Sequence, residues 1–163
     1  MIFSNPAEYA IRALSELVLV AADPAQANGR KPGYVMLDKL VENASLPREF
    51  LAKIFRSLVE AGVLLSAKGP GGGFSLARPA HEITLLQIIE AIDGTSHTDS
   101  CVVGLARCDD TMPCPQHDLF KPIRQRLKAY LATTTLADTA ASLRDKRAAI
   151  AKTPAVPAAQ PAK

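Results

Sequence analysis

The strongest constraint on the fold comes from residues 36–76, which hold two short helical patterns, a glycine and a glycine-rich hairpin in that order. The second helical pattern opens at Ser45 with a capping-type start, has a proline near its first turn, and stops at Gly62. Two strand-like runs, residues 63–66 and 74–76, then flank the tip sequence KGPGGG. This order predicts a winged helix-turn-helix, within a mainly α fold that has a small β-hairpin wing.

Helical patterns also lie on both sides of this segment. An amphipathic helix is expected from Asn5, another from Thr84 as N-cap to a stop at Gly94, and two more between residues 118 and 150. In the helix that starts at residue 118, apolar side chains recur at helical spacing, which in so small a domain predicts packing against a partner subunit. This apolar stripe comprises Leu119, Ile123, Leu127, Tyr130 and Leu131.

We therefore divide the 163-residue chain into four parts. Residues 1–93 form the predicted winged helix-turn-helix DNA-binding domain. Residues 94–117 form a polar loop that carries all three cysteines, and we interpret it as a sensor loop. Residues 118–151 are the predicted dimerisation helices, and residues 152–163, rich in proline and alanine, are expected to be disordered.

Charge is unevenly distributed along the chain. Residues 28–78 sum to +4 and residues 121–163 to +7, while residues 79–120 between them sum to −6. The basic stretches suit an anionic partner such as DNA, and the acidic middle suits a sensor turned away from phosphates.

Several classes of protein are disfavoured. The chain has no uninterrupted apolar stretch of about 18 residues, and its N-terminus lacks the basic region and cleavage site of a secretory signal. We therefore expect a cytoplasmic protein with no membrane partner. The odd number of cysteines argues against a disulfide framework. No Ser/His/Asp or paired-carboxylate arrangement stands out, so we do not expect an enzyme.

The predicted recognition helix and wing carry the candidate DNA contacts. Polar and basic side chains at the start and exposed side of the helix would meet base edges and phosphates, and glycines in the wing would let the backbone approach phosphate closely. The candidate residues are Ser45, Arg48, Glu49, Lys53, Arg56, Lys68, Gly71 and Gly72. The plainer alternative is a solvated basic face and a flexible turn. A nucleotide-binding P-loop is disfavoured, because the glycine run lacks the Lys-Ser/Thr ending.

Three cysteines and a histidine lie within 17 residues of the polar loop, namely Cys101, Cys108, Cys114 and His117. No closely spaced cysteine pair occurs, so the spacing points away from a zinc finger and towards a cluster held by a longer wrapping loop. Thiolates are the main ligands of iron–sulfur clusters, and replacing one of them by histidine changes reduction potential and lability. The residues therefore favour an iron–sulfur sensor site.

Other interpretations of this loop stay open. Each cysteine could be a small buried hydrophobic residue, and His117 could cap the helix that follows. A thiol-based redox switch would need only two of the cysteines and a lowered pKa, for which Arg107 beside Cys108 is the nearby cation. A small cluster carrier or redox protein, in which the helices are only a scaffold, is the alternative from another class. Such a carrier should show no sequence preference for DNA.

Together these residues resemble the Rrf2 family of bacterial winged-helix regulators. The resemblance covers most of residues 1–150 and is carried by EYAIRAL, LPREFLAKIFRSLVEAGVLLSAKGPGGGFSLAR, ITLLQIIEAIDG and the cysteine loop ending in CPQH. It implies a homodimeric DNA-binding transcriptional regulator, a repressor by preference. In such a regulator a long C-terminal helix pairs across the two-fold axis, and an iron–sulfur cluster in the loop controls operator affinity.

The resemblance also implies a set of cluster ligands. Cys101, Cys108 and Cys114 match the three cluster cysteines of the family. The fourth ligand is a histidine of the same loop in some members, where His117 stands, and an acid in the N-terminal helix of the partner subunit in others, where Glu8 stands. We favour His117. The cysteine spacing of six and five residues departs slightly from that of several members, so both [2Fe–2S] and [4Fe–4S] stay open.

A two-fold dimer would set two recognition helices about one turn of DNA apart, about 34–36 Å, and predicts a pseudo-palindromic operator in double-stranded DNA. Loss or oxidation of the cluster would release the loop and shift the DNA-binding heads. A repressor of the same fold that responds to thiol redox state or a small ligand, without a cluster, is the alternative. Glu8 also has an ordinary role open to it, an ion pair with Arg12 one turn along its helix.

Overall fold

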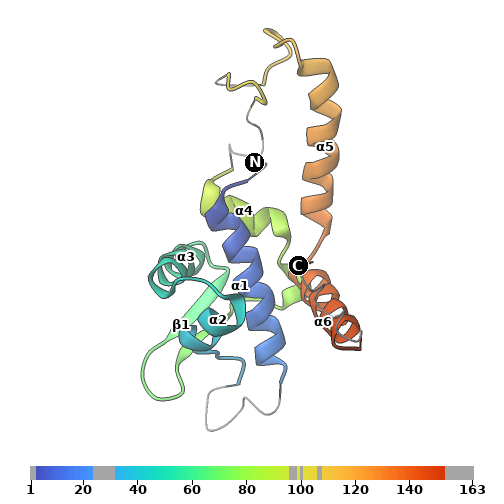
Figure 1. Cartoon of the computed structure of the whole chain (residues 1–163). Coiled ribbons are helices and arrows are strands. Elements are labelled where there is room, and N and C mark those ends of the chain that lie inside the picture. The colour runs from blue at the N-terminus through green and yellow to red at the C-terminus, as the bar shows by residue number, and fades with distance from the viewer. Residues whose placement is uncertain (1–2, 24–31, 96–98, 100, 106–107, 153–163) are drawn as a thin grey trace, which may run out of the picture.

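The computed structural model describes residues 3–23, 32–95, 99, 101–105 and 108–152 (Figure 1). Its elements, in chain order, are α1 (Asn5–Ala21), α2 (Leu37–Ala44), α3 (Arg48–Glu60), β1 (Leu64–Ala67), β2 (Gly73–Leu76), the 3₁₀ turn η2 (Ala80–Glu82), α4 (Leu85–Asp93), α5 (His117–Thr133) and α6 (Leu136–Lys152). The predicted fold class, mainly helical with a small antiparallel hairpin, is confirmed. The predicted tail lies outside the described residues apart from Lys152, the last residue of α6.

Helix α1 lies at the centre, and α2, α3, α4 and α6 all pack against it (Figure 1). Pro6 lies in its first turn and the Ser4 side chain caps it by accepting from the backbone N–H of Ala7. Its inward side alternates small and large residues, with Ala10, Leu14 and Leu17 almost completely buried. We call α1 to α4 together with the wing the head.

Helix α3 fixes the wing to the head through aromatic packing. Phe55 is fully buried and meets Phe74 of β2 edge to face, with ring centroids 5.0 Å apart. Leu51 and Leu58, which precede and follow Phe55 by about one turn, are also fully buried. The wing therefore has a fixed position relative to the recognition helix.

The turn between α2 and α3 differs from the sequence prediction. Ser45 does not cap the second helix: it ends α2 in the left-handed conformation, with φ of 53°, and the N-cap of α3 is Pro47, without a side-chain cap. The left-handed conformation causes steric strain in serine that glycine would avoid. Contacts of the surrounding structure must therefore stabilise this turn. Leu46, buried between the two helices, anchors it.

Strands β1 and β2 pair antiparallel with Leu64 opposite Leu76 and Ala67 opposite Gly73. Phe74 also exchanges both backbone hydrogen bonds with Val35, each 2.9 Å long. The segment before α2 is therefore joined to the wing by a single antiparallel β-bridge. A side chain at position 73 would collide with the backbone of this bridge, because a Cβ there would lie 2.3 Å from the Val35 carbonyl oxygen. The close approach requires Gly73.

The N-cap predicted for α4 is confirmed as a full capping box, with Thr84 and Gln87 bonding reciprocally, and Gly94 ends the helix. Helix α5 then stands away from the head, and α6 returns along α1 (Figure 1). Backbone hydrogen bonds from Leu136 to Ile83 and from Leu85 to Thr134 fasten the joint between these two helices to the start of α4. Leu131 and Leu136 are buried in the same core as the head.

Candidate DNA-binding surface and cysteine site

The exposed side of α3 carries three of the predicted DNA contacts. Glu49, Lys53 and Arg56 are spaced by four and three residues, which puts them on one line along the helix, and all three are exposed. Ser45, at the turn that precedes α3, is exposed too. These residues therefore form one exposed polar face of mixed charge, which a recognition helix would turn towards a DNA groove.

Arg48, the first residue of α3, is exposed and already has a partner. Its Nε atom donates to Asp38 Oδ1 of α2 at 2.5 Å. Because both side chains are more than half exposed, the pair is worth at most about 1 kcal/mol, which a phosphate contact can offset. Asp38 thus holds Arg48 in place without making it unavailable to DNA.

The wing tip places Lys68 in solvent just after β1 ends. Gly71, at the tip, has φ of 75°, a conformation that favours glycine, and it is only partly buried. Gly72 is buried, and a Cβ there would lie 2.3 Å from the Ala67 carbonyl oxygen. Gly71 and Lys68 are therefore the accessible members of the predicted wing contacts, while Gly72 shapes the turn.

The described residues of the cysteine loop, 101–105 and 108–117, lie at the outer end of α5, far from α3 and the wing (Figure 1). Cys101 and Cys114 are buried, with exposed fractions of 7% and 9%, and their thiols interact with each other. The backbone N–H of Val103 donates to the Cys101 sulfur and is the main reason that the pKa of this thiol is lowered. Burial is the main reason that the pKa of Cys114 is raised. The two neighbouring thiols are therefore chemically unequal.

His117 lies beside the third cysteine. Its side chain is 6% exposed, and its Nδ1 atom lies 3.4 Å from the sulfur of Cys108. The other ring nitrogen, Nε2, lies 2.6 Å from the carboxylate of Asp110. Asp110 in turn accepts from Lys121 Nζ through both oxygens, at 2.6 and 2.7 Å. The hydrogen bond from Lys121 is the largest reason that the pKa of the Asp110 carboxyl is lowered, and the His117 hydrogen bond comes second.

A basic face of α5 holds this acidic loop in place. Lys121 binds Asp110, Lys128 Nζ binds both carboxylate oxygens of Asp99 at 3.0 Å, and Arg124 donates to the Asp99 carbonyl at 3.3 Å. The basic residues recur at i, i+3 and i+7 and so share one side of the helix. Part of the positive charge that the sequence places after residue 120 is thus used inside the chain.

The donor set fits one kind of metal group better than another. In the described part of the chain, no three His, Cys, Asp or Glu side chains converge as one metal ion would require. The donors instead meet as Cys101 with Cys114 and Cys108 with His117, and Cys108 also lies near enough to Cys114 to help raise the pKa of that thiol. A two-iron cluster takes two protein ligands on each iron, and imidazole can replace thiolate on one of them. The donors therefore fit an iron–sulfur cluster better than a single ion.

Glu8 is exposed in the first turn of α1. No hydrogen bond or ion pair joins it to the cysteine loop among the described residues. The suggested ion pair with Arg12 does not form either, because Arg12 donates to the Ala44 carbonyl at 2.9 Å and its guanidinium lies over the ring of Tyr9, 5.9 Å from the centroid. Arg12 therefore stabilises the end of α2, next to the turn between α2 and α3.

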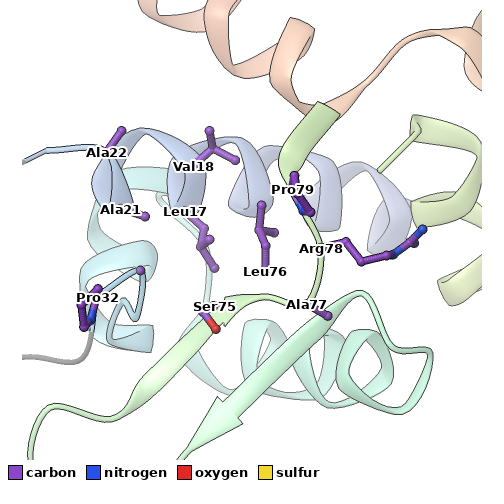
Figure 2. A pocket seen from close by; sticks show the side chains of 11 residues that line it. Leu17, Val18, Ala21, Ala22, Pro32, Ser75, Leu76, Ala77, Arg78 and Pro79 are labelled. Atoms are coloured by element: carbon purple, nitrogen blue, oxygen red, sulfur yellow. The ribbon is translucent and has the colours of Figure 1, made fainter. Parts of the chain in front are cut away.

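A cavity of about 520 Å³ lies between the end of α1, strand β2 and the segment that follows it (Figure 2). Leu17, Val18, Leu76 and Pro79 make most of its lining apolar. No thiol, imidazole or carboxylate lines it, so it is separate from the cysteine site.

A family model described as "Iron-dependent Transcriptional regulator", that of the Rrf2 family, matches residues 3–142. The chain belongs to the Rrf2 family. The match spans the head, the cysteine loop and the beginning of α6. In the described residues of this Rrf2 protein, no helix is long and apolar enough to cross a membrane.

Relatives named as regulators agree with this assignment. The chain is 31% identical over 140 residues to a protein of Aquifex aeolicus named as an HTH-type transcriptional regulator, covering 85% of this chain and 90% of the relative. It is 28% identical to the HTH-type transcriptional regulator IscR of Photobacterium profundum, covering 85% and 74%. Among solved structures it is similar to CymR, the global cysteine regulator of B. subtilis, with a TM-score of 0.65, 27% identity and coverage of 85% and 95%. This Rrf2 protein is therefore a transcriptional regulator with IscR-like and CymR-like relatives.

Sequence reasoning missed the residues that support the site. Asp110 and Lys121 were not singled out, although Asp110 follows Cys108 by two positions and Lys121 follows His117 by one helical turn. Arg107, proposed as the cation beside Cys108, lies outside the described residues. Two described cations of α5 act on the site: Lys121 through Asp110, and Arg124, which helps to lower the pKa of the Cys101 thiol.

Proposed function

We propose that this Rrf2-family regulator controls its affinity for DNA through an iron–sulfur cluster bound by Cys101, Cys108, Cys114 and His117. The observation that carries the proposal is the buried His117 ring, with Nδ1 beside the Cys108 sulfur. Thiolates and imidazole are the ligand types that iron–sulfur clusters take, and this loop brings three thiols and one imidazole to the outer end of α5. The pairing of the donors favours [2Fe–2S] over [4Fe–4S].

The cluster, when bound, supplies a group whose charge and ligation change with oxidants, iron supply or small reactive gases. The chain supplies the response. The loop joins α4 to α5, so a change in the loop acts on the last helix of the head and on the helix that leads to α6. At the other end, Glu49, Lys53 and Arg56 of α3 contact base edges and phosphates, and Lys68 neutralises a phosphate at the wing.

The active form in this proposal is a homodimer paired through α5. Leu119, Ile123 and Tyr130 are 70%, 59% and 57% exposed, whereas Leu131 at the base of the same stripe is buried in the head. An exposed apolar stripe on a helix that stands clear of the head favours a partner subunit over solvent. Two heads would then bind a pseudo-palindromic operator in double-stranded DNA.

The test of the cluster is the visible absorption spectrum, with iron and sulfide analysis, of protein purified without oxygen. We expect a coloured wild type and a colourless Cys108→Ala variant. Operator affinity, measured with and without the cluster, should differ for the wild type and not for Cys108→Ala. A wild type that takes up no iron after anaerobic reconstitution would contradict the proposal.

The fourth ligand is tested by comparing His117→Ala with Glu8→Ala. We expect the spectrum and stability of the cluster to change in His117→Ala and to stay as in the wild type in Glu8→Ala. The reverse result would assign the ligand to Glu8 and make the site span two subunits.

The dimer is tested by analytical ultracentrifugation of the Ile123→Asp variant, which should be monomeric if α5 forms the interface.

A thiol switch without a cluster is the second candidate, and the contact between Cys101 and Cys114 favours it. Their unequal pKa values suit a pair in which Cys101 ionises first and forms a disulfide with Cys114 under an oxidant. Mass mapping of the oxidised, iron-free protein distinguishes the candidates. A Cys101–Cys114 disulfide that alone changes DNA affinity would support the switch.

A further inference from the structure

Asp110 joins two residues of the first turns of α5. Its carboxylate contacts His117 Nε2 at 2.6 Å and Lys121 Nζ at 2.6 and 2.7 Å. Asp110 itself is 70% exposed, so burial does not fix it, and the two contacts with α5 do. The result is a chain of polar contacts from Lys121 through Asp110 to His117, which ends at the Cys108 sulfur.

The direction of the His117 ring follows from these contacts. Both oxygens of Asp110 already accept from the Lys121 ammonium, and a carboxylate held in this way only accepts hydrogen bonds, so the proton between Asp110 and His117 belongs to Nε2. In the neutral imidazole the other nitrogen, Nδ1, then carries a lone pair. That lone pair faces Cys108, on the same side as the thiols.

We propose that Asp110 is a positioning residue that keeps the proton on Nε2 of His117 and so presents Nδ1, rather than Nε2, as the nitrogen ligand beside Cys108. Outer carboxylates of this kind orient metal-binding histidines and increase their basicity. The part of the proposal that concerns the cluster rests on the function proposed above. The part that concerns the ring and its proton can be measured without a cluster.

The neighbouring acid provides a matched control. Asp109 precedes Asp110 in the same loop, and its carboxylate accepts from the backbone N–H and the hydroxyl of Thr111, both at 2.7 Å. Asp109→Ala therefore removes the same charge from the same loop without removing the acceptor of His117. Lys121→Met is a second control, because it removes the anchor of Asp110 to α5 but keeps the carboxylate.

The first experiment is nitrogen NMR of the full-length, iron-free protein with ¹⁵N-labelled histidine. We expect the Nε2–H of the His117 ring to exchange slowly with water in the wild type, in Asp109→Ala and in Lys121→Met, and rapidly in Asp110→Ala. A wild-type ring protonated on Nδ1, or on both nitrogens as an imidazolium beside a Cys108 thiolate, would overturn the proposal. Slow exchange that persists in Asp110→Ala would overturn it as well.

The second experiment labels histidine with ¹⁵N at Nδ1 alone or at Nε2 alone and measures nitrogen coupling in pulsed EPR of the reduced cluster. We expect coupling from Nδ1 in the wild type, and loss of the cluster about 10-fold faster or more in Asp110→Ala but not in Asp109→Ala. Coupling from Nε2 would overturn the positioning role. A bound cluster without histidine coupling, or a protein that takes up no iron, would overturn the proposed function, while the NMR result still decides the role of Asp110 on the ring.

Discussion

The head and the cysteine loop of this Rrf2 protein are built on opposite principles. The head buries its apolar residues, including Leu14, Phe55 and Ile88, and exposes most of its charges, Glu16 excepted. The loop does the reverse: Val102, Val103 and Leu105 are about half exposed and Met112 is 80% exposed, while Cys101, Cys114 and His117 are buried. The difference shows that the head is folded by a hydrophobic core, whereas the loop is folded around its thiols and imidazole.

The two regions also differ in what holds them to the rest of the chain. The joint of α5 and α6 is fastened to the head by backbone hydrogen bonds and by buried leucines. The loop is fastened to α5 by ion pairs of exposed side chains, those of Asp110 with Lys121 and Asp99 with Lys128. Exposed ion pairs are weak and screened by salt. Within the described residues, the loop is therefore held to α5 by weaker contacts than those that hold the α5–α6 joint to the head.

The largest effect should come from the core of the head. Replacing Phe55 by alanine removes a fully buried ring that packs on Phe74, so we expect the free energy of unfolding to fall by about 3–5 kcal/mol. Denaturant unfolding followed by circular dichroism measures this. Leu65→Ala, at a half-exposed position of β1, is the control and should change stability by less than about 1 kcal/mol. Equal effects at both positions would contradict a head organised around Phe55.

A partly buried ion pair between the head and α6 can be compared with the exposed ion pairs of the loop. Glu16 of α1 is 3% exposed and receives a bidentate contact from Arg147 of α6, one of its bonds measuring 2.9 Å. Arg147→Met leaves a buried carboxylate without its partner, so we expect a loss of about 1–3 kcal/mol. The double variant Glu16→Gln with Arg147→Met should recover part of this loss in the same unfolding assay. If the double variant is as unstable as the single one, the buried charge is not the cause.

A change at the wing tip should weaken DNA binding without changing stability. Lys68→Ala removes one exposed cation, so we expect a several-fold weaker affinity for all DNA sequences and a salt slope smaller by about one. Titrations with operator and unrelated DNA at several salt concentrations measure both. Lys128→Ala, which lies on α5 and pairs with the loop, is the matched control and should leave the slope unchanged. A selective loss for the operator alone would mean that Lys68 contacts bases.

The smallest effect should come from the ion pairs of the loop. Lys128→Met releases the Asp99 carboxylate, and we expect less than about 1 kcal/mol of lost stability. Protease cleavage within the loop should nevertheless become faster, because this ion pair is one of the contacts that hold the described part of the loop to α5. The wild type in high salt should show the same acceleration, since salt screens exposed pairs. Cleavage that moves into the head instead would show that the two regions are not independent.

Local signals in the sequence predict most of the head. Apolar spacing, Gly62 and the glycine-rich hairpin give the helices and the wing, and Thr84 with Gln87 gives a capping box that the structure confirms. The sequence predicts Ser45 as the start of the second helix, whereas it ends α2. The residue type alone cannot distinguish a left-handed serine at a C-cap from a serine at an N-cap. Buried Leu46, next to it, decides the turn through tertiary packing.

The candidate site was only half visible in the sequence. The cysteines and His117 stand out by residue type and spacing, so the sequence alone predicts them as candidate ligands. The supporting contacts depend on how the loop folds back on α5, which joins Asp99 to Lys128 across 29 positions and Asp110 to Lys121 across 11. Glu16 and Arg147 are 131 positions apart. No periodicity connects such residues, because only the tertiary fold brings them together.

His117 is both the candidate ligand and the first residue of α5. The first turn of this helix is weakly connected to the rest, because Pro122 has no N–H to donate to the Asp118 carbonyl. Starting a helix is the unfavourable step of its formation, and lengthening it is not. In the proposed function, a group that holds the His117 ring would also favour the first turn of α5, and we expect that turn to fray when the group leaves. The state of a few atoms at the outer end of the molecule would then change the length of the helix that carries the apolar stripe.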